Sequence, residues 1–415
     1  MRRSTVIVGA SIGGVRTAQA LRSAGYEGRV TLVGDEETPP YDRPPLSKGF
    51  LAGTATDQSM TLLTEADARD LDVRLMLGRA ARRLDIAGGF VELDDGERLR
   101  YDDVVIATGS RARPSPWGKP AGVHYLRTRG DAAGLRADLR GGGPLVVIGA
   151  GFIGAEVAAT ARRLGVEVTL VDPAPVPMSR GLDTSTAARL GGMHREHGVS
   201  TRFGTQVEGI ERGGGGLVVC LADGSVLNAA AIVVGIGAVP NTEWLGSSGL
   251  RIGAGVACDA HCRAYGAPQV RAIGDVAEWH HTGRGTLVRS EHWTNAVEQA
   301  GYVAADIARP GEQGPFQAIE YVWSDQYDAK IQIIGQTSSA ARRVTVERPG
   351  SARSFAVLYA TSAGELEGAV SVSWPQAALA ARRAVVAGTH LDEVHASLEA
   401  IATITPPRPA APVGN

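Results

Sequence analysis

A short apolar run, a glycine-rich turn, a helical stretch and a second apolar run occur twice in this chain of 415 residues. The first copy turns at Gly9-x-Ser11-x-x-Gly14 and ends with the run 30–33. The second turns at Gly149-x-Gly151-x-x-Gly154 and ends with the run 168–171. Each copy predicts a βαβ unit, and therefore a parallel sheet covered by helices.

The glycines in these turns also predict a ligand. They permit a tight turn and a close approach of the backbone to a pyrophosphate, which binds at the positive N-terminus of the next helix. An acid follows the second strand in each copy, Asp35 or Glu36 in the first and Asp172 in the second, and can accept a ribose hydroxyl. Ser11 replaces the second glycine of the first turn, and we expect its small side chain to be tolerated. The sequence therefore predicts that the chain binds two dinucleotides.

Further apolar runs read as buried parallel strands. The run 104–109 closes the first unit and the run 232–237 closes the second, each ending in glycine. We expect both strands to stop against a cofactor. A later run, 270–276, contains the pair Gly274-Asp275 at the end of its apolar part.

Length and charge narrow the possible functions. At ~150 residues per domain the chain has room for about three domains. Its 42 Lys+Arg and 44 Asp+Glu give a net charge of -2, so no global positive field attracts nucleic acid or an acidic membrane. Charge-free apolar stretches such as 229–239 are shorter than the ~18 residues that a membrane-spanning helix needs.

The cysteines and the N-terminus indicate a reducing compartment. Cys220, Cys258 and Cys262 are too few for a disulfide framework, and we interpret Cys258-x3-Cys262 as structural rather than metal-binding. Arg2 and Arg3 precede a glycine-rich turn, not the apolar region of a signal peptide. We expect a cytoplasmic protein.

An ordered set of motifs resembles the bacterial FAD-dependent, NADH-dependent ferredoxin reductases of the putidaredoxin reductase and rhodocoxin reductase type. The two glycine turns are shared by many flavoproteins, whereas Pro-Pro-Leu-Ser-Lys at 44–48 and Trp-Ser-Asp-Gln-Tyr at 323–327 are much narrower. Ala-Thr-Gly at 107–109 and Ile-Gly-Asp at 273–275 complete the set, and the resemblance covers roughly residues 4–400.

The resemblance implies an α/β fold with two Rossmann-like dinucleotide-binding domains, in a glutathione-reductase-like arrangement, and a C-terminal α+β domain. In this family the NAD domain is inserted into the FAD domain. The implied boundaries are 1–112 and 242–318 for the FAD domain, 113–241 for the NAD domain and 319–404 for the C-terminal domain, with a disordered tail at 405–415. Short strands are expected near 330–334, 344–346, 354–359 and 368–373, followed by a helix after Trp374.

The resemblance also implies the site. It places Lys48 near flavin N5, paired with Glu156, and makes these two residues the candidate catalytic pair. A compact ammonium group can stabilise negative charge that develops beside one flavin nitrogen. The candidate cofactor-binding residues are Gly9, Ser11, Gly13, Gly14, Asp35, Lys48, Ala81, Thr108, Gly109, Arg127, Gly149, Gly151, Phe152, Gly154, Asp172, Gly237, Gly274, Asp275, Trp293 and Trp323.

Within this set the resemblance implies specific places along FAD. They are the adenosine end for Gly13 and Asp35, the flavin neighbourhood for Lys48 and Ala81, a flavin-nucleotide contact for Arg127, and the ribityl and isoalloxazine ends for Asp275 and Trp293.

The absence of a cysteine pair in the segment 41–48 distinguishes this chain from the disulfide reductases among flavoenzymes. Disulfide reductases carry a Cys-x4-Cys pair where this chain reads 41–48 without cysteine, so no dithiol relay is available. FAD accepts a hydride and can release electrons singly, which points to an external [2Fe-2S] ferredoxin as acceptor.

We therefore expect an FAD-dependent NADH:ferredoxin oxidoreductase that supplies a cytochrome P-450 monooxygenase or a Rieske oxygenase. Two alternatives stay open, an NADH oxidase or quinone or dye reductase, and an NADH-sensing flavoprotein scaffold. Arginines that could form a local basic face for an acidic ferredoxin are Arg342, Arg343, Arg353, Arg382 and Arg383.

Overall fold

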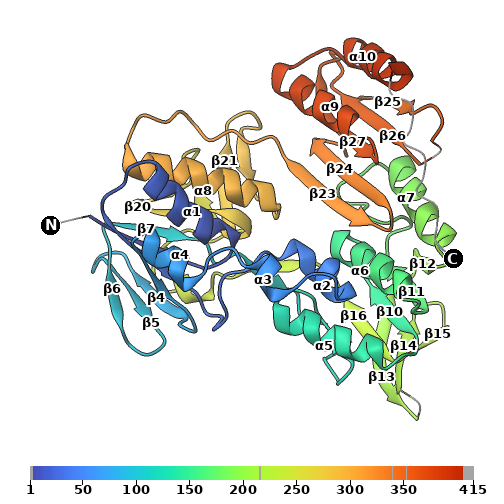
Figure 1. Cartoon of the computed structure of the whole chain (residues 1–415), viewed down its shortest axis with the longest axis horizontal. Coiled ribbons are helices and arrows are strands. Elements are labelled where there is room, and N and C mark those ends of the chain that lie inside the picture. Colours follow the sequence, from blue (N-terminus) through green and yellow to red (C-terminus); the bar gives the residue numbers. More distant parts are fainter. Residues whose placement is uncertain (1–2, 215, 339, 352, 405–415) are drawn as a thin grey trace. The chain divides into compact units, whose positions relative to one another are not determined.

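The computed structural model describes residues 3–214, 216–338, 340–351 and 353–404 (Figure 1). The expected tail at 405–415 lies outside the described residues. The chain forms two compact units, each assembled from segments that are distant in sequence. The first comprises the described residues of Met1–Pro45, Gly53–Arg113 and Gly237–Ala318, and the second those of Leu46–Ala52, Pro114–Ile236 and Ile319–Asn415. The domain boundaries expected from the sequence stay a prediction.

The first unit is built on a large mixed sheet. Its β1 pairs in parallel with β2 on one side and with β7 on the other, and β20 continues the parallel part beside β7. Almost all positions of these strands are buried, as the apolar runs predicted. The strand order is β22 (Thr286–Val288), β21 (Ala277–His281), β18 (Val256–Cys258), β19 (Arg263–Ala264), β20 (Ala267–Ala272), β7 (Asp103–Ile106), β1 (Ser4–Val8), β2 (Arg29–Val33) and β3 (Val73–Met76).

Helices α1 (Ile12–Ser23) and α8 (Trp293–Ala308) lie side by side in this unit (Figure 1). Small and apolar residues of both helices, such as Ala18 and Ala304, are fully buried in the same core as the sheet. The remaining elements of the unit are α3 (Asp57–Met60), α4 (Glu65–Asp70), the sheet β4 (Ala81–Asp85), β5 (Phe90–Leu93) and β6 (Arg98–Arg100), the pair β8 (Ser110–Ala112) and β17 (Ala238–Pro240), and short 3₁₀ turns at Glu243–Leu245 and Gly274–Val276.

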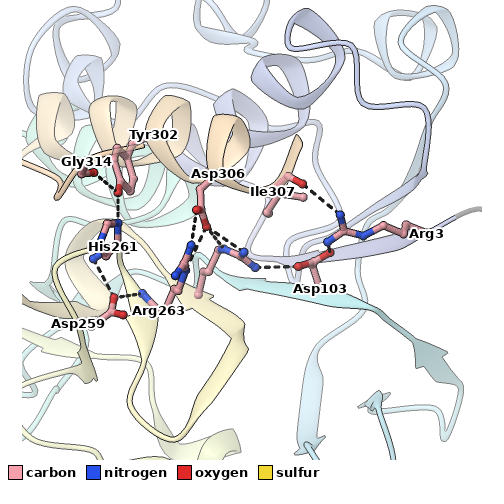
Figure 2. A network of polar contacts seen from close by, with 10 residues as sticks. Arg3, Asp103, Asp259, His261, Arg263, Tyr302, Asp306, Ile307 and Gly314 are labelled. Atoms are coloured by element: carbon pink, nitrogen blue, oxygen red, sulfur yellow. Dashed lines mark hydrogen bonds and ion pairs between the residues drawn. The ribbon is translucent and has the colours of Figure 1, made fainter. Parts of the chain in front are cut away.

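A row of charged side chains lies inside the first unit (Figure 2). The buried guanidinium of Arg271 contacts Asp103 at 2.8 Å and Asp306 at 2.9 Å, and both carboxylates are almost fully buried. Arg3 contacts Asp103 at 2.7 Å, and Arg263 contacts Asp306 at 2.5 Å. The row therefore links β7, β20 and α8 through paired charges, which is the arrangement that buried charges require.

The second unit contains another parallel sheet. Its β10 (Leu145–Ile148) pairs with β11 (Val168–Asp172) and with β16 (Ala231–Val234), so the second predicted βαβ unit is confirmed. The other elements of this region are β9 (Val123–His124), α5 (Arg129–Arg140), α6 (Phe152–Arg163), α7 (Thr184–Glu196), β12 (Ser200–Phe203), β13 (Val207–Gly213), β14 (Gly216–Leu221) and β15 (Val226–Ala229).

The C-terminal part of the second unit is an antiparallel sheet covered by two helices (Figure 1). The four expected strands and the helix after Trp374 are present, with ends that differ from the expected ones by a few residues. The strand order is β23 (Tyr321–Gln326), β24 (Ala329–Gly335), β27 (Leu366–Val372), β26 (Phe355–Ala360) and β25 (Arg342–Glu347), and the helices are α9 (Pro375–Ala387) and α10 (Leu391–Ile404).

This sheet shares a core with α7 and the segment before it. Leu182 and Leu190 are buried together with Ile331 and Tyr359. The Oδ2 atom of Asp183, the N-cap residue of α7, accepts a hydrogen bond from Tyr359 at 2.6 Å. The packing explains why the dinucleotide-binding region and the C-terminal sheet form one unit.

Candidate cofactor and electron-transfer site

The first glycine turn connects β1 to α1. Gly9 has a φ of +116°, and a Cβ there would lie 2.2 Å from the carbonyl oxygen of Ala107. A Cβ on Gly14 would lie 1.9 Å from the carbonyl oxygen of Gly9. Neither position admits a side chain without movement of the backbone, so the fold itself requires these two glycines.

The second turn, between β10 and α6, repeats this geometry. Gly149 has a φ of +101°, and its Cβ would lie 2.2 Å from the carbonyl oxygen of Gly235. A Cβ on Gly154 would lie 1.9 Å from the carbonyl oxygen of Gly149. A Cβ on Gly151 would meet nothing within 4 Å, so this side of the turn faces open space. Phe152 is the first residue of α6.

Both helices begin in a way that fits a phosphate group. The N-cap residues are Ser11 for α1 and Gly151 for α6, and neither makes a side-chain capping hydrogen bond. No acidic residue lies in the first turn of either helix. The first backbone N–H groups and the positive end of the helix dipole thus remain available for an anion. The turns fit the pyrophosphates of two dinucleotides.

The acids after β2 differ in their surroundings. Asp35 is exposed, whereas Glu36 is half-buried and accepts hydrogen bonds from Tyr41 at 2.6 Å and Arg43 at 2.7 Å. Arg43 also donates to the hydroxyl of Ser11 at 3.3 Å. The placement of Asp35 at the FAD adenosine stays a prediction.

Asp172 ends β11 and holds two loops together. Its Oδ2 accepts the backbone N–H of Ala150 at 2.7 Å, and its Oδ1 accepts that of Ala174 at 2.8 Å. A carboxylate has four lone-pair sites, so both oxygens can still accept a ribose hydroxyl. The side chain is half-exposed and lies beside the second glycine turn.

Two further candidates lie at the ends of strands in the first unit. Thr108 donates its hydroxyl to the carbonyl of Asn241 at 2.9 Å, and Asn241 returns a bond to the Thr108 carbonyl at 2.8 Å. Asp275 accepts a hydrogen bond from Ser110 at 2.7 Å, and the N–H of the preceding Gly274 is donated to Gln299 at 2.7 Å. Sequence reasoning missed Ser110 and Gln299, since neither belongs to a motif.

The remaining candidates of the first unit have diverse positions. Trp293 begins α8 and donates its indole N–H to Asp42 at 2.8 Å. Ala81 begins β4, Gly109 has a φ of +62°, and Gly237 has a φ of +116°. Gly13, Gly9 and Gly14 belong to the first turn described above.

In the second unit, Arg127 precedes α5 and its backbone N–H is donated to Asp131 at 3.2 Å. Trp323 lies on β23 and its ring stacks near that of Tyr321, with centroids 6.3 Å apart.

Lys48 belongs to the second unit because the segment around it packs there. The short helix α2 (Gly49–Ala52) places Leu51 in the core between α5 and α6. Thr160 of α6 donates its hydroxyl to the carbonyl of Ser47 at 2.7 Å. These contacts fix Ser47 and Lys48 over one side of α6.

The structure brings Lys48 and Glu156 together. The Lys48 ammonium lies 2.8 Å from Oε2 of Glu156, whose side chain is only 3% exposed. The same oxygen accepts the hydroxyl of Ser47 at 2.5 Å, and Oε1 accepts that of Ser324 at 2.8 Å. The buried carboxylate is thus held by one cation and two hydroxyl donors, which offset the cost of its burial.

Burial disfavours the thiolate form of two of the three cysteines. Cys258 and Cys262 are buried, and burial raises the pKa of both far above the usual range. Within the described residues no cluster of three His, Cys, Asp or Glu side chains could hold a metal ion. Among the same residues, no helix has the length and apolar character needed to cross a membrane.

Comparisons with known proteins agree with this geometry. Residues 3–300 match the family model "Pyridine nucleotide-disulphide oxidoreductase", and residues 321–402 match "Reductase C-terminal". Rhodocoxin reductase of Rhodococcus erythropolis is 40% identical over 82% of this chain and 80% of its own length. Putidaredoxin reductase of Pseudomonas putida is 37% identical, over 86% and 85% of the two chains.

Solved structures of related reductases also resemble this chain. The covalent putidaredoxin reductase–putidaredoxin complex contains a chain that is 32% identical, with a TM-score of 0.90 over 97% of this chain and 99% of that one. A water-forming NADH oxidase from Lactobacillus brevis, at 19% identity and a TM-score of 0.86, shares the fold. The chain belongs to the pyridine nucleotide-disulphide oxidoreductase family and, within it, to the ferredoxin reductases of the rhodocoxin reductase and putidaredoxin reductase type.

Proposed function

We propose that this protein binds FAD through the first glycine turn and NADH through the second, takes a hydride from NADH, and passes electrons singly to a [2Fe-2S] ferredoxin. The observation that carries the proposal is the pair of glycine turns, each followed by a helix N-terminus that no side chain caps. The ferredoxin in turn supplies a cytochrome P-450 monooxygenase or a Rieske oxygenase.

The thiols support an acceptor outside the chain. FAD, when bound, supplies the conversion of a two-electron hydride into single electrons. The only cysteines in the sequence are Cys220, Cys258 and Cys262, and the last two are buried with raised pKa values, so no thiolate relay takes part. The three thiols form no disulfide, which supports a cytoplasmic location.

Lys48 and Glu156 are the proposed catalytic pair. With FAD bound, the Lys48 ammonium would lie beside the flavin and would stabilise negative charge on it. Glu156 holds the ammonium in one position through their 2.8 Å contact. Because the carboxylate is buried, its position is set by the surrounding donors rather than by water.

The partner is inferred from relatives. Rhodocoxin reductase and putidaredoxin reductase are named for the ferredoxins that they reduce, and another relative is the ferredoxin–NAD(+) reductase component of the p-cumate 2,3-dioxygenase system of Pseudomonas putida. Several of the arginines expected to form a basic face are instead paired with acids. Arg342 contacts Asp392 at 3.5 Å, and Arg353 contacts Asp328 at 3.4 Å.

Steady-state turnover tests the proposal. NADH oxidation is measured with oxygen alone, with a quinone, and with a panel of [2Fe-2S] ferredoxins and cytochrome c as final acceptor. We expect a compatible ferredoxin to raise turnover well above the oxygen rate, and added salt to weaken its apparent affinity because exposed charges are screened beyond ~8 Å. Fast turnover with oxygen or a quinone and no stimulation by any ferredoxin would favour the oxidase alternative. Reduction of FAD with no acceptor at all would favour the scaffold.

A further inference from the structure

The strand β23 carries two polar side chains on its buried face. Ser324 and Gln326 are both 0% exposed, whereas the intervening Asp325 and the preceding Trp323 are half-buried. Buried polar groups cost free energy unless they are hydrogen-bonded. Their partners therefore indicate why this face of the strand is polar.

The partners lead directly to Glu156. Ser324 donates its hydroxyl to Oε1 of Glu156 at 2.8 Å, and the Ser324 oxygen accepts the amide N–H of Gln326 at 3.1 Å. The other carboxylate oxygen accepts Ser47 and Lys48. Glu156 is thus an acceptor in each of these contacts.

The chain of contacts continues into α7. His194 is fully buried near the end of this helix, and its Nδ1 lies 2.8 Å from the hydroxyl of Tyr327. The Gln326 side chain interacts electrostatically with the His194 imidazole. Gln326 Oε1 and His194 Nε2 are both buried, and within the described residues neither atom makes a direct hydrogen bond, so a bond that joins these two atoms belongs to the proposal below and not to the observed contacts.

Backbone geometry supports the position of Tyr327. This residue follows β23 with a φ of +57°, a region that a bulky side chain rarely adopts. Its ring stacks on that of His197 with centroids 3.8 Å apart and planes 10° apart. The same side chain places its hydroxyl 2.8 Å from Nδ1 of His194.

The donors in this chain can all point the same way. If Tyr327 donates to Nδ1 of His194, then Nε2 of the neutral imidazole carries the proton and is able to donate it to Oε1 of Gln326. The Gln326 amide donates to Ser324, and Ser324 donates to the carboxylate. Aligned donors polarise one another, so such a chain is stronger than its separate bonds.

We propose that Tyr327, His194, Gln326 and Ser324 form a polarised hydrogen-bond chain that positions the Glu156 carboxylate against Lys48. These are positioning residues, since the contacts that carry the proposal are with protein groups and end on Glu156. The proposal rests on the proposed function of the Lys48–Glu156 pair. It gives the C-terminal strand β23 a role in flavin reduction.

The kinetic test uses the FAD-loaded enzyme and anaerobic stopped-flow reduction by NADH. Ser324→Ala removes the last donor, and we expect a limiting reduction rate lower by roughly tenfold, the effect of one lost hydrogen bond to a charged group, with little change in the apparent Kd for NADH. Ser324→Thr keeps the hydroxyl and should restore most of the rate. Ser371→Ala is the matched control, because Ser371 is 1% exposed in the same sheet and bonds only to the Trp374 carbonyl among the contacts seen.

The Glu156→Gln background separates the possible outcomes. If Ser324 acts through Glu156, Ser324→Ala should cause no further loss in this background. An equal loss in both backgrounds, or an equal loss for Ser371→Ala, would overturn the proposal. A normal rate for Glu156→Gln itself would mean that the proposed catalytic pair fails, and the positioning chain with it. If Ser324→Ala does not fold, Gln326→Met removes the preceding donor and is judged in the same way.

A second readout does not depend on turnover. Nitrogen-15 NMR of histidine-labelled, FAD-loaded enzyme reports the His194 tautomer, with His194→Gln used for assignment. We expect a neutral ring with the proton on Nε2 at pH 7. A proton on Nδ1 would reverse the donor direction and would overturn the proposal even if the kinetic results were as expected.

Discussion

At the residue scale, the most informative side chain is Lys48. The chain has 42 Lys+Arg but only three lysines, Lys48, Lys119 and Lys330. Lys48 is 20% exposed at its side chain and contacts a nearly buried carboxylate. A lysine kept in this setting, in a chain that otherwise uses arginine, is consistent with a need for a compact charge.

The pairing of Lys48 with Glu156 could be expected from the family resemblance, but Ser47 and Ser324 as its further donors could not. Ser324 is separated from Glu156 by 168 residues, and a serine in a strand has no sequence pattern that indicates its partner. The contact exists only in the folded unit that contains both residues, so it could be identified only from the structure.

Replacement of Lys48 tests its charge. Lys48→Met should slow reduction of FAD by NADH by at least tenfold while FAD stays bound, since ~1.4 kcal/mol of lost transition-state stabilisation gives a tenfold effect. The measurement is stopped-flow bleaching of the flavin. Lys119→Met is the control, because Lys119 is exposed and its ammonium lies 4.7 Å from the centroid of the Tyr125 ring. Equal rates for both variants would return Lys48 to an ordinary surface role.

Asp172 predicts the nucleotide preference. Its carboxylate ends β11 beside the second glycine turn and would repel the 2′-phosphate of NADPH while accepting the 2′-hydroxyl of NADH. We expect kcat/KM to be at least tenfold higher for NADH than for NADPH. Asp172→Asn keeps an acceptor without the charge and should reduce this ratio. A wild-type preference for NADPH would show that Asp172 does not face the ribose.

At the element scale, α7 connects the dinucleotide-binding region to the C-terminal sheet. The apolar runs predicted the strands on both sides, because buried strands have a strong pattern. They did not predict that Leu182 and Leu190 share a core with Tyr359, since a helix's apolar face does not specify which sheet covers it.

His194 makes the stability of this connection depend on pH. Burial, together with the charges of His197 and Arg195, lowers the pKa of His194 to about 4, although Gln326 acts in the opposite direction. The unfolded chain, with a histidine pKa near ~6.5, therefore binds more protons than the folded chain between the two values. The folded state should lose about 3 kcal/mol as the pH falls from 6.5 to 4.

Urea unfolding at a series of pH values measures this effect. His194→Gln has no titrating group and should show a smaller loss between pH 6.5 and 4, whatever its stability at neutral pH. A variant with the same pH dependence as the wild type would mean that other groups cause it.

The charged row in the first unit is a second element-scale feature. Burial would raise the pKa of Asp306, but hydrogen bonds from Arg263 and the charge of Arg271 lower it. The folded-state pKa of Asp306 is depressed, so its contribution to the free energy of unfolding is present above the unfolded pKa and is lost as the pH falls through the folded pKa.

Replacement of Arg271 tests the charged row. Arg271→Met leaves two buried carboxylates with one fewer cation and should lower the free energy of unfolding by about 3 kcal/mol at pH 7. The measurement is the free energy of urea unfolding. The exposed control Arg98→Met should lower it by less than about 1 kcal/mol. An equal loss for Arg271→Met and Arg98→Met would contradict this account.

At the scale of the whole molecule, the fold class was predictable because its main signal is repeated. Two glycine turns, each between apolar strands, specify two βαβ units before any partner contact is known. The assignment of Leu46–Ala52 to the second unit was not predictable, because it depends on Leu51 packing between α5 and α6. That packing decides which unit carries Lys48.

The central claim is that one NADH delivers two single electrons to ferredoxin. The most direct measurement is anaerobic mixing of catalytic enzyme with a limiting, known amount of NADH and excess oxidised [2Fe-2S] ferredoxin, followed by the ferredoxin absorbance. The account predicts two ferredoxins reduced per NADH, with no reduction when the enzyme lacks FAD. Two results together would contradict it. NADH would be oxidised completely when oxygen is present, and no ferredoxin tried would be reduced when oxygen is absent.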